Sequence, residues 1–159
     1  MIYQSIPVSH RTVMVIASDR ANFQLVTQLI ARRDDLKLLT ATQGRQGVEI
    51  TTACQPDVVV MDTGLQDICG LEALKMLRDN FSTSHIPVIA LSSDAHQSHI
   101  DQGLKAGFYR YLTKPFRLTD LLDAIDSAVQ FNPRNIGPAW SASNSGGGGE
   151  GHARHVSAP

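Results

Sequence analysis

The amino-acid sequence predicts an α/β fold, a doubly wound five-stranded parallel sheet with helices on both faces. Short apolar runs rich in β-branched residues alternate five times with segments whose apolar residues recur every three or four positions, as in amphipathic helices. Strands that are separated by single helices run parallel and are joined by right-handed crossovers. The run Asp57–Met61 is apolar on both faces, which is typical of a central strand with helices on each side.

The first half of the chain supplies two strand–helix pairs. Thr12–Ala17 is a short apolar run, and we expect Ser18 or Asp19 to cap the helix that follows by accepting from its free N–H groups. The apolar residues of this helix share one face: Phe23, Val26, Leu29 and Ile30. Lys37–Ala41 is predicted as the second strand and Gly44–Cys54 as the second helix.

The second half supplies three more pairs. The predicted strands are Asp57–Met61, Ile86–Leu91 and Phe108–Leu112. The helices after them carry apolar residues at helical spacing: Leu71, Leu74 and Leu77 in the third, Ile100 and Leu104 in the fourth, and Leu118, Leu121, Leu122, Ile125 and Val129 in the fifth. The fourth helix is expected to end near Gly107.

The two ends of the chain differ from this pattern. Residues 1–11 have no sustained period and are predicted to be an N-terminal extension to a domain of residues 12–131. Residues 132–159 contain a Ser/Asn run, four consecutive glycines and Trp140. Such a composition cannot repay its ordering entropy by burial, so we expect a flexible Gly/Ser-rich C-terminal tail.

Composition and charge exclude several classes of function. With 14 basic and 15 acidic residues the formal net charge is −1, and no basic stripe suited to nucleic acid is present. The sequence contains no apolar stretch of about 18 residues that would span a membrane, and its start does not resemble a secretory signal. Cys54 and Cys69 form no CxxC pair, so we expect packing cysteines in a reducing, cytoplasmic location.

Three polar side chains follow the carboxyl ends of predicted strands, where doubly wound sheets bind their ligands. Asp62 follows the third strand, Ser92 the fourth and Lys114 the fifth. A carboxylate can attack a phosphoryl group to form an acyl phosphate. An ammonium and a hydroxyl can stabilise the phosphoryl oxygens. The trio therefore favours phosphoryl acceptance on Asp62.

Four motifs, in this order, resemble a response-regulator receiver domain. They are Val60–Asp62, Gly70–Leu74, Ile86–Ser92 with Ala106–Gly107, and Tyr111–Phe116. The resemblance covers about residues 12–131 and is closest to the receivers of hybrid histidine kinases. It implies the (βα)5 flavodoxin-like receiver fold.

The resemblance also implies roles for individual residues. Asp62 matches the phosphoacceptor that becomes 4-aspartylphosphate, and Lys114 matches the family's cation. Ser92 matches the switch hydroxyl, and Tyr111 resembles the aromatic that turns inward with it. The peptide bond between Lys114 and Pro115 is expected to be cis, as is usual in this family.

The chain departs from the family at the Mg²⁺ site. A typical receiver has two adjacent acidic residues at the end of its first strand, and Ala17 and Ser18 occupy those positions here. The expected metal ligands are Asp62, the backbone carbonyl of Gly64 and, one residue beyond the usual pair, Asp19. Mg²⁺ prefers near-octahedral oxygen ligands, so we expect a weakened site.

The sequence therefore predicts a single-domain response regulator of a two-component phosphorelay. It would take a phosphoryl group from a histidine kinase or histidine phosphotransfer protein and signal to a protein target through residues 95–131, with no membrane or nucleic-acid partner. Any catalysis would be limited to its own phosphorylation and dephosphorylation, so it is not expected to be an enzyme. The alternative is a phosphorylation-independent pseudo-receiver that acts as an interaction adaptor.

Other readings of the same residues are weaker. Asp62-Thr63-Gly64 also spells an aspartic-protease signature, but that class needs two such aspartates on a β-rich scaffold. A dehalogenase-type phosphatase needs a second aspartate where Gly64 stands. His96 and His99 lie three residues apart but lack further ligands in the sequence pattern, so we expect them to face solvent.

Overall fold

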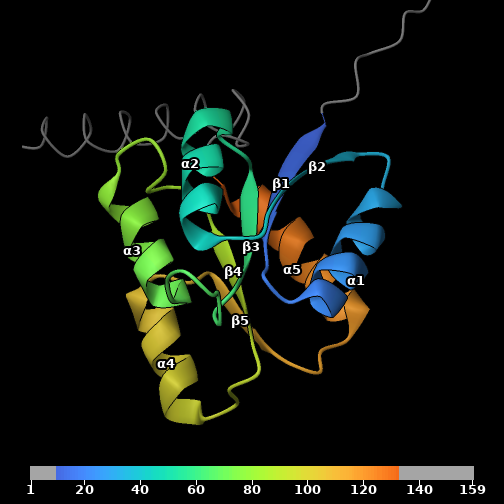
Figure 1. Cartoon of the computed structure of the whole chain (residues 1–159). Helices are drawn as coiled ribbons and strands as arrows, with labels where there is room; N and C mark the ends of the chain where they lie inside the picture. The colour runs from blue at the N-terminus through green and yellow to red at the C-terminus, as the bar shows by residue number, and fades with distance from the viewer. Residues whose placement is uncertain (1–9, 133–159) are drawn as a thin grey trace, which may run out of the picture.

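The computed structural model describes residues 10–132, in which five strands alternate with five helices. The strands are β1 (Arg11–Ile16), β2 (Leu36–Ala41), β3 (Val58–Asp62), β4 (Val88–Ser92) and β5 (Arg110–Thr113). The helices are α1 (Arg20–Ala31), α2 (Gly44–Cys54), α3 (Gly70–Asp79), α4 (Gln97–Ala106) and α5 (Leu118–Phe131). All paired strands are parallel, in the order β2-β1-β3-β4-β5, which confirms the predicted fold class (Figure 1).

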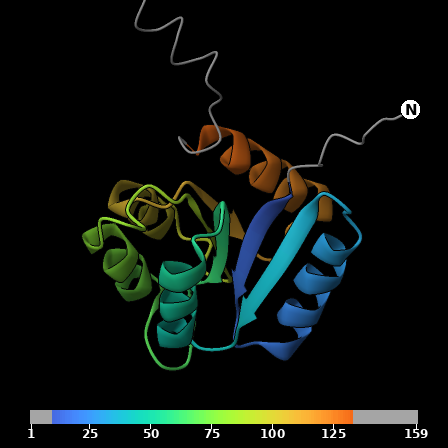
Figure 2. The ribbon, with the colours of Figure 1, turned by 90° about the horizontal axis from the view of Figure 1, so that it is seen from above.

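The helices cover both faces of the sheet. Figure 2 shows α1 and α5 on one face and α2, α3 and α4 on the other. Successive side chains of a strand point to opposite faces, so Val13 and Val15 of β1 pack in the core under α1 and α5, whereas Met14 and Ile16 pack in the core under α2 and α3. Within residues 10–132, no helix combines the length and the apolarity that a membrane crossing requires.

Every residue of β3 is buried, as expected for the central strand. The predicted strand boundaries agree with the observed ones to within two residues, and α2 covers the predicted range. β4 begins at Val88 rather than at Ile86, because Pro87 has no N–H to donate to the ladder. β1 begins at Arg11, inside the predicted extension. Residues 1–9 of that extension and residues 133–159 of the predicted tail, with Trp140, lie outside the described residues.

Two local predictions were wrong. Asp19 occupies the N-cap position of α1, but no side-chain hydrogen bond caps the helix. The Ser18 hydroxyl instead donates to the carbonyl oxygen of Thr42, at 2.8 Å. Cys54 and Cys69 are free thiols, as expected, but both are exposed rather than packed in the core.

The end of α5 is attached to the amino end of the central strand. The side-chain amide of Asn132, which is fully buried, donates to the carbonyl oxygen of Asp57 at 2.9 Å. The carboxylate of Asp57 in turn accepts from the backbone N–H of Thr12 at 2.7 Å. These bonds join the last helix, β1 and β3 at the edge of the sheet opposite to Asp62.

α2 approaches the sheet closely because it carries a glycine at the contact. A Cβ atom on Gly47 would lie 2.6 Å from Cγ1 and 3.0 Å from Cγ2 of Ile16, closer than packed carbon atoms approach. Ile16 is fully buried in the core under α2 and α3, so any displacement of its side chain disturbs packed neighbours.

Gly47→Ala should therefore lower the free energy of unfolding. Overpacking costs about 1–3 kcal/mol, and the better helix propensity of alanine returns about 1 kcal/mol. The measurement is the urea midpoint, with Gly64→Ala as the control because a Cβ there meets no atom within 4 Å. A Gly47→Ala variant as stable as the control would show that α2 can move away from β1.

Candidate functional site

The predicted site residues follow neighbouring strand ends. Asp62 ends β3 and Ser92 ends β4. In the sheet Asp62 pairs with Leu91, and Ser92 pairs with Thr113. The ladder continues past β5, because the backbone N–H of Lys114 donates to the carbonyl of Ser92 at 2.7 Å. The structure thus brings the carboxylate, hydroxyl and ammonium to one edge of the sheet.

Asp62 and Lys114 form a partly buried ion pair. The Lys114 ammonium lies 2.8 Å from Oδ1 of Asp62, and the two side chains are 23% and 4% exposed. The pair is close, but it lacks the alignment of a hydrogen bond. The peptide bond between Lys114 and Pro115 is cis, as expected.

The charge of Asp62 is unfavourable in this position. Burial raises the pKa of its carboxyl above the ordinary value, and the negative charge of Asp19 adds to the increase. The ammonium of Lys114 acts in the opposite direction but does not cancel the effect of burial. Asp62 is therefore a desolvated carboxylate with one cation beside it, which suits a nucleophile better than a solvated surface group.

The surroundings of Asp62 fit Mg²⁺ with a reduced set of ligands. Ala17 is buried and offers no oxygen on its side chain, and the Ser18 hydroxyl is already hydrogen-bonded to Thr42. Asp19 is exposed and acts on the charge of Asp62, so the two carboxylates repel each other. A divalent cation would remove this repulsion, and Mg²⁺ is commonly held by one or two carboxylates together with water.

Ser92 and Tyr111 line the same pocket, of about 270 Å³, between the end of β4 and α4. The Tyr111 ring packs beside Gly103 of α4, where an added Cβ would meet it at 2.7 Å. It also meets the Phe108 ring edge-on, with centroids 6.0 Å apart. The two residues that resemble the family's switch pair are thus connected by one cavity.

Asp67 fixes the loop after β3, a role that the sequence analysis missed. Its carboxylate accepts from the backbone N–H groups of Gly44 and Arg45, at 2.7 and 2.9 Å, and so caps α2. These hydrogen bonds lower the pKa of Asp67. Asp67 is 22 or more residues away in sequence from the N–H groups that it caps, so no local sequence pattern predicts this cap.

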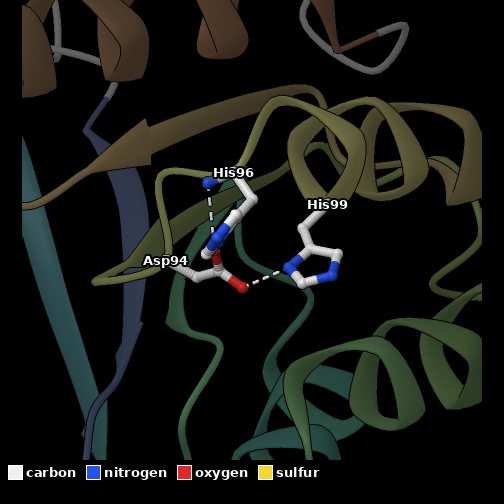
Figure 3. A group of neighbouring side chains, drawn as sticks. All are labelled: Asp94, His96 and His99. Atoms are coloured by element: carbon white, nitrogen blue, oxygen red, sulfur yellow. Dashed lines mark hydrogen bonds and ion pairs between the residues drawn. The ribbon is translucent and has the colours of Figure 1, made fainter.

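The expectation that His96 and His99 lack further ligands was wrong, although both are exposed. Asp94 hydrogen-bonds both imidazoles, through Oδ1 to His96 Nδ1 at 2.7 Å and through Oδ2 to His99 Nδ1 (Figure 3). Hydrogen bonds from the His96 backbone and from both rings hold the pKa of Asp94 well below its usual range. The sequence signal that could have predicted this cluster is Asp94, two residues before His96.

Comparison with known proteins agrees with this geometry. The model of the response regulator receiver domain matches residues 13–126. The polar-differentiation response regulator DivK of Brucella anthropi is 26% identical over 117 residues, which are 74% of this chain and 94% of DivK.

Solved receiver domains have the same fold. The receiver domain of a Francisella response regulator has a TM-score of 0.70 and 26% identity, and the match covers 76% of this chain and 98% of that one. The receiver domain of a sensor histidine kinase from Pseudomonas aeruginosa has a TM-score of 0.69 and 22% identity, with the same coverage, and was solved with a magnesium ion in its active-site cleft.

The family match covers well over half of the chain, and it lies on the part that forms the sheet and the site. This chain therefore belongs to the response regulator receiver domains of two-component signalling systems, the family that its motifs resemble.

Proposed function

We propose that Asp62 accepts a phosphoryl group from a histidine kinase or a histidine phosphotransfer protein and that the domain signals by changing conformation. The observation that carries this proposal is the buried Asp62 carboxylate, in contact with Lys114 at the end of the central strand. Burial of a carboxylate destabilises the folded state, and carboxylates with a perturbed pKa are concentrated at functional sites. This supports a role for Asp62 as the phosphoryl acceptor.

In the proposed reaction a carboxylate oxygen of Asp62 attacks the phosphorus of the donor's phosphohistidine. The new O–P bond forms as the P–N bond breaks, and the imidazole leaves with its electron pair and takes a proton. The ammonium of Lys114 is placed to offset the charge of the transferred phosphoryl oxygens. Ser92, at the neighbouring strand end, is placed to donate a hydrogen bond to one of them.

Mg²⁺ would be held by Asp62, Asp19 and the backbone carbonyl of Gly64, with water in the remaining positions. When bound it would neutralise charge on the phosphoryl oxygens. Asp19 lies one residue beyond the family's acidic pair, and Ala17 and Ser18 add no carboxylate. We therefore expect phosphorylation to require more Mg²⁺ than in a receiver with the full acidic set.

The proposed output passes from Ser92 through Tyr111 to the surface formed by residues 95–131. The shared pocket supports this route, because movement of Ser92 toward Asp62 would open space for the Tyr111 ring. The proposal assigns the receiver role to residues 12–131, with 1–11 and 132–159 as extensions. The proposal also assigns the protein to the cytoplasm, where ATP supplies the phosphoryl group of histidine kinases.

A second candidate is an adaptor that works without phosphorylation. The hydrogen bond from Ser18 to Thr42 favours it, because that hydroxyl is engaged away from the place where a metal would bind. The same adaptor would use the surface of residues 95–131 to bind its protein target.

The first test is phosphorylation by a small donor. The full chain is incubated with acetyl phosphate or phosphoramidate, with and without Mg²⁺, and its intact mass is measured. We expect one phosphoryl adduct that requires Mg²⁺, is lost in Asp62→Ala and persists in Asp123→Ala, which removes an exposed aspartate of α5. Absence of an adduct under every condition would favour the adaptor.

The second test restores a missing carboxylate. Ser18→Asp should strengthen Mg²⁺ binding about tenfold or more, because a third carboxylate adds to the negative field around the ion. Isothermal titration with Mg²⁺ measures the change, and Ser82→Asp is the control, in the exposed loop between α3 and β4 at the opposite edge of the sheet. Unchanged affinity in Ser18→Asp would place the metal away from the end of β1.

The third test concerns the buried charge. Because burial raises the pKa of Asp62, its ionised form disfavours folding at neutral pH, and this penalty disappears as the pH falls below the ordinary carboxyl pKa of about 3.9. Asp62→Asn should therefore have a higher urea midpoint than the unsubstituted chain at neutral pH, and the gain should shrink on acidification. Asp123→Asn should show neither effect. A less stable Asp62→Asn variant at neutral pH would show that the ion pair with Lys114 outweighs the burial.

A further inference from the structure

Asp94, His96 and His99 place three metal-ligating side chains together at the start of α4. Their ligand atoms all lie within 4.8 Å of one another (Figure 3). Figure 3 shows the carboxylate between the two rings, with one oxygen directed to each side. It is the one such group of histidine, cysteine or acidic side chains found among residues 10–132.

The backbone fixes the relative positions of these ligands. The N–H of His96 donates to Oδ1 of Asp94 at 3.0 Å, which holds the carboxylate beneath the helix terminus. The N–H of His99 donates to the carbonyl of His96 at 3.0 Å and closes the first turn. Residues three apart in a helix share a face, and the ring centroids of His96 and His99 are 5.3 Å apart.

The donor chemistry selects the kind of ion. Two imidazole nitrogens and one carboxylate oxygen suit zinc and other late transition metals, whereas Mg²⁺ and Ca²⁺ prefer all-oxygen sites. Metal–ligand bonds of about 2.0–2.2 Å in a tetrahedron separate ligand atoms by about 3.3–3.6 Å. The ligand atoms of the cluster lie within 4.8 Å of one another, so they are already close to this spacing before an ion is bound.

The cluster is open to solvent on the side where an ion would enter. The side chains of His96 and His99 are 79% and 52% exposed. Three protein ligands leave a fourth tetrahedral position for water or for a group from another molecule. The site is thus suited to reversible binding rather than to a buried structural ion.

Asp94 also connects the cluster to the predicted switch. Its backbone N–H donates to the Ser92 hydroxyl oxygen at 3.0 Å. Asp94, His99, Ser92 and Tyr111 all line the pocket between β4 and α4. A ligand that holds Asp94 against α4 therefore restrains the segment that carries Ser92.

We propose that Asp94, His96 and His99 form a binding site for a divalent transition-metal ion, with Zn²⁺ as the representative ion, and that the bound ion restrains the loop between β4 and α4. The site itself is independent of phosphorylation. Its consequence for signalling rests on the proposed function: a restrained loop opposes the movement of Ser92 toward phosphorylated Asp62.

The test of the site is a Zn²⁺ titration of the full chain, followed by calorimetry or by competition with a coloured chelator. We expect one ion per chain at the cluster, and at least an approximately tenfold weaker affinity in His99→Gln and in Asp94→Asn, since loss of even a residue that supports a ligand costs about 10–100-fold. Co²⁺ bound in place of Zn²⁺ should give the visible spectrum of a four-coordinate site, and His99→Gln should abolish it.

The controls separate this cluster from other ligands of the chain. His152→Gln with His155→Gln, and separately Cys69→Ser, should leave the affinity of the cluster unchanged. Loss of binding in either control with full binding in His99→Gln would overturn the proposal, as would an absence of Zn²⁺ binding.

The loop restraint has its own measurement. Backbone hydrogen exchange of residues 93–99 should slow when Zn²⁺ is added to the unphosphorylated chain and should not change in His99→Gln. Unchanged exchange with bound Zn²⁺ would overturn the restraint. Because neither readout uses phosphorylation, failure of Asp62 to form an adduct would leave this result intact, and the two proposals fail separately.

Discussion

The position of one carboxylate in the sheet constrains most of the domain. Asp62 ends a strand that is buried along its whole length, so its charge has little water around it. Desolvation of a charge is tolerated only when opposite charge or hydrogen bonds compensate. Here Lys114, two strands away in the sheet, compensates for part of the desolvation, and its contact with Asp62 depends on the register of β3, β4 and β5. The two apolar cores on either face keep that register, because a slip by one residue would exchange the faces of every side chain in a strand.

The same constraint explains what the sequence could and could not predict. Strand and helix positions were predictable because burial leaves a pattern in the sequence. Burial on both faces leaves a continuous apolar run, as in Val58–Met61, and burial on one face leaves a helical period, as in the α5 residues Leu121 and Ile125. The strand-end location of Asp62 and Lys114 followed from parallel topology alone. The direct contact between the Lys114 ammonium and the Asp62 carboxylate could not be predicted, because it depends on the side-chain conformations in the folded chain.

Hydrogen bonds made by side chains in loops could not be predicted, because they produce no periodic pattern in the sequence. The Ser18 hydroxyl had two possible partners. It could accept from the free N–H groups at the start of its own helix, or donate to the carbonyl oxygen of Thr42, 24 residues away, and in the folded chain it does the second. Asp67 caps a helix that precedes it, contrary to the usual direction of local capping. The hydrogen bonds that Asp94 accepts from His96 and His99 join residues close in sequence, but they form only because the Asp94 carboxylate lies against the first turn of α4.

The hydrogen bond from Asn132 to Asp57 has a practical consequence for biosensor design. It attaches the end of α5 to the amino end of β3, whereas Asp62 lies at the carboxyl end of the same strand. Five strand residues at about 3.3 Å each separate those two edges by about 17 Å. A fluorescent reporter joined after Asn132 therefore starts on the side of the sheet away from the edge that carries Asp62. Donor access to Asp62 and optical readout can then be engineered independently in the same molecule.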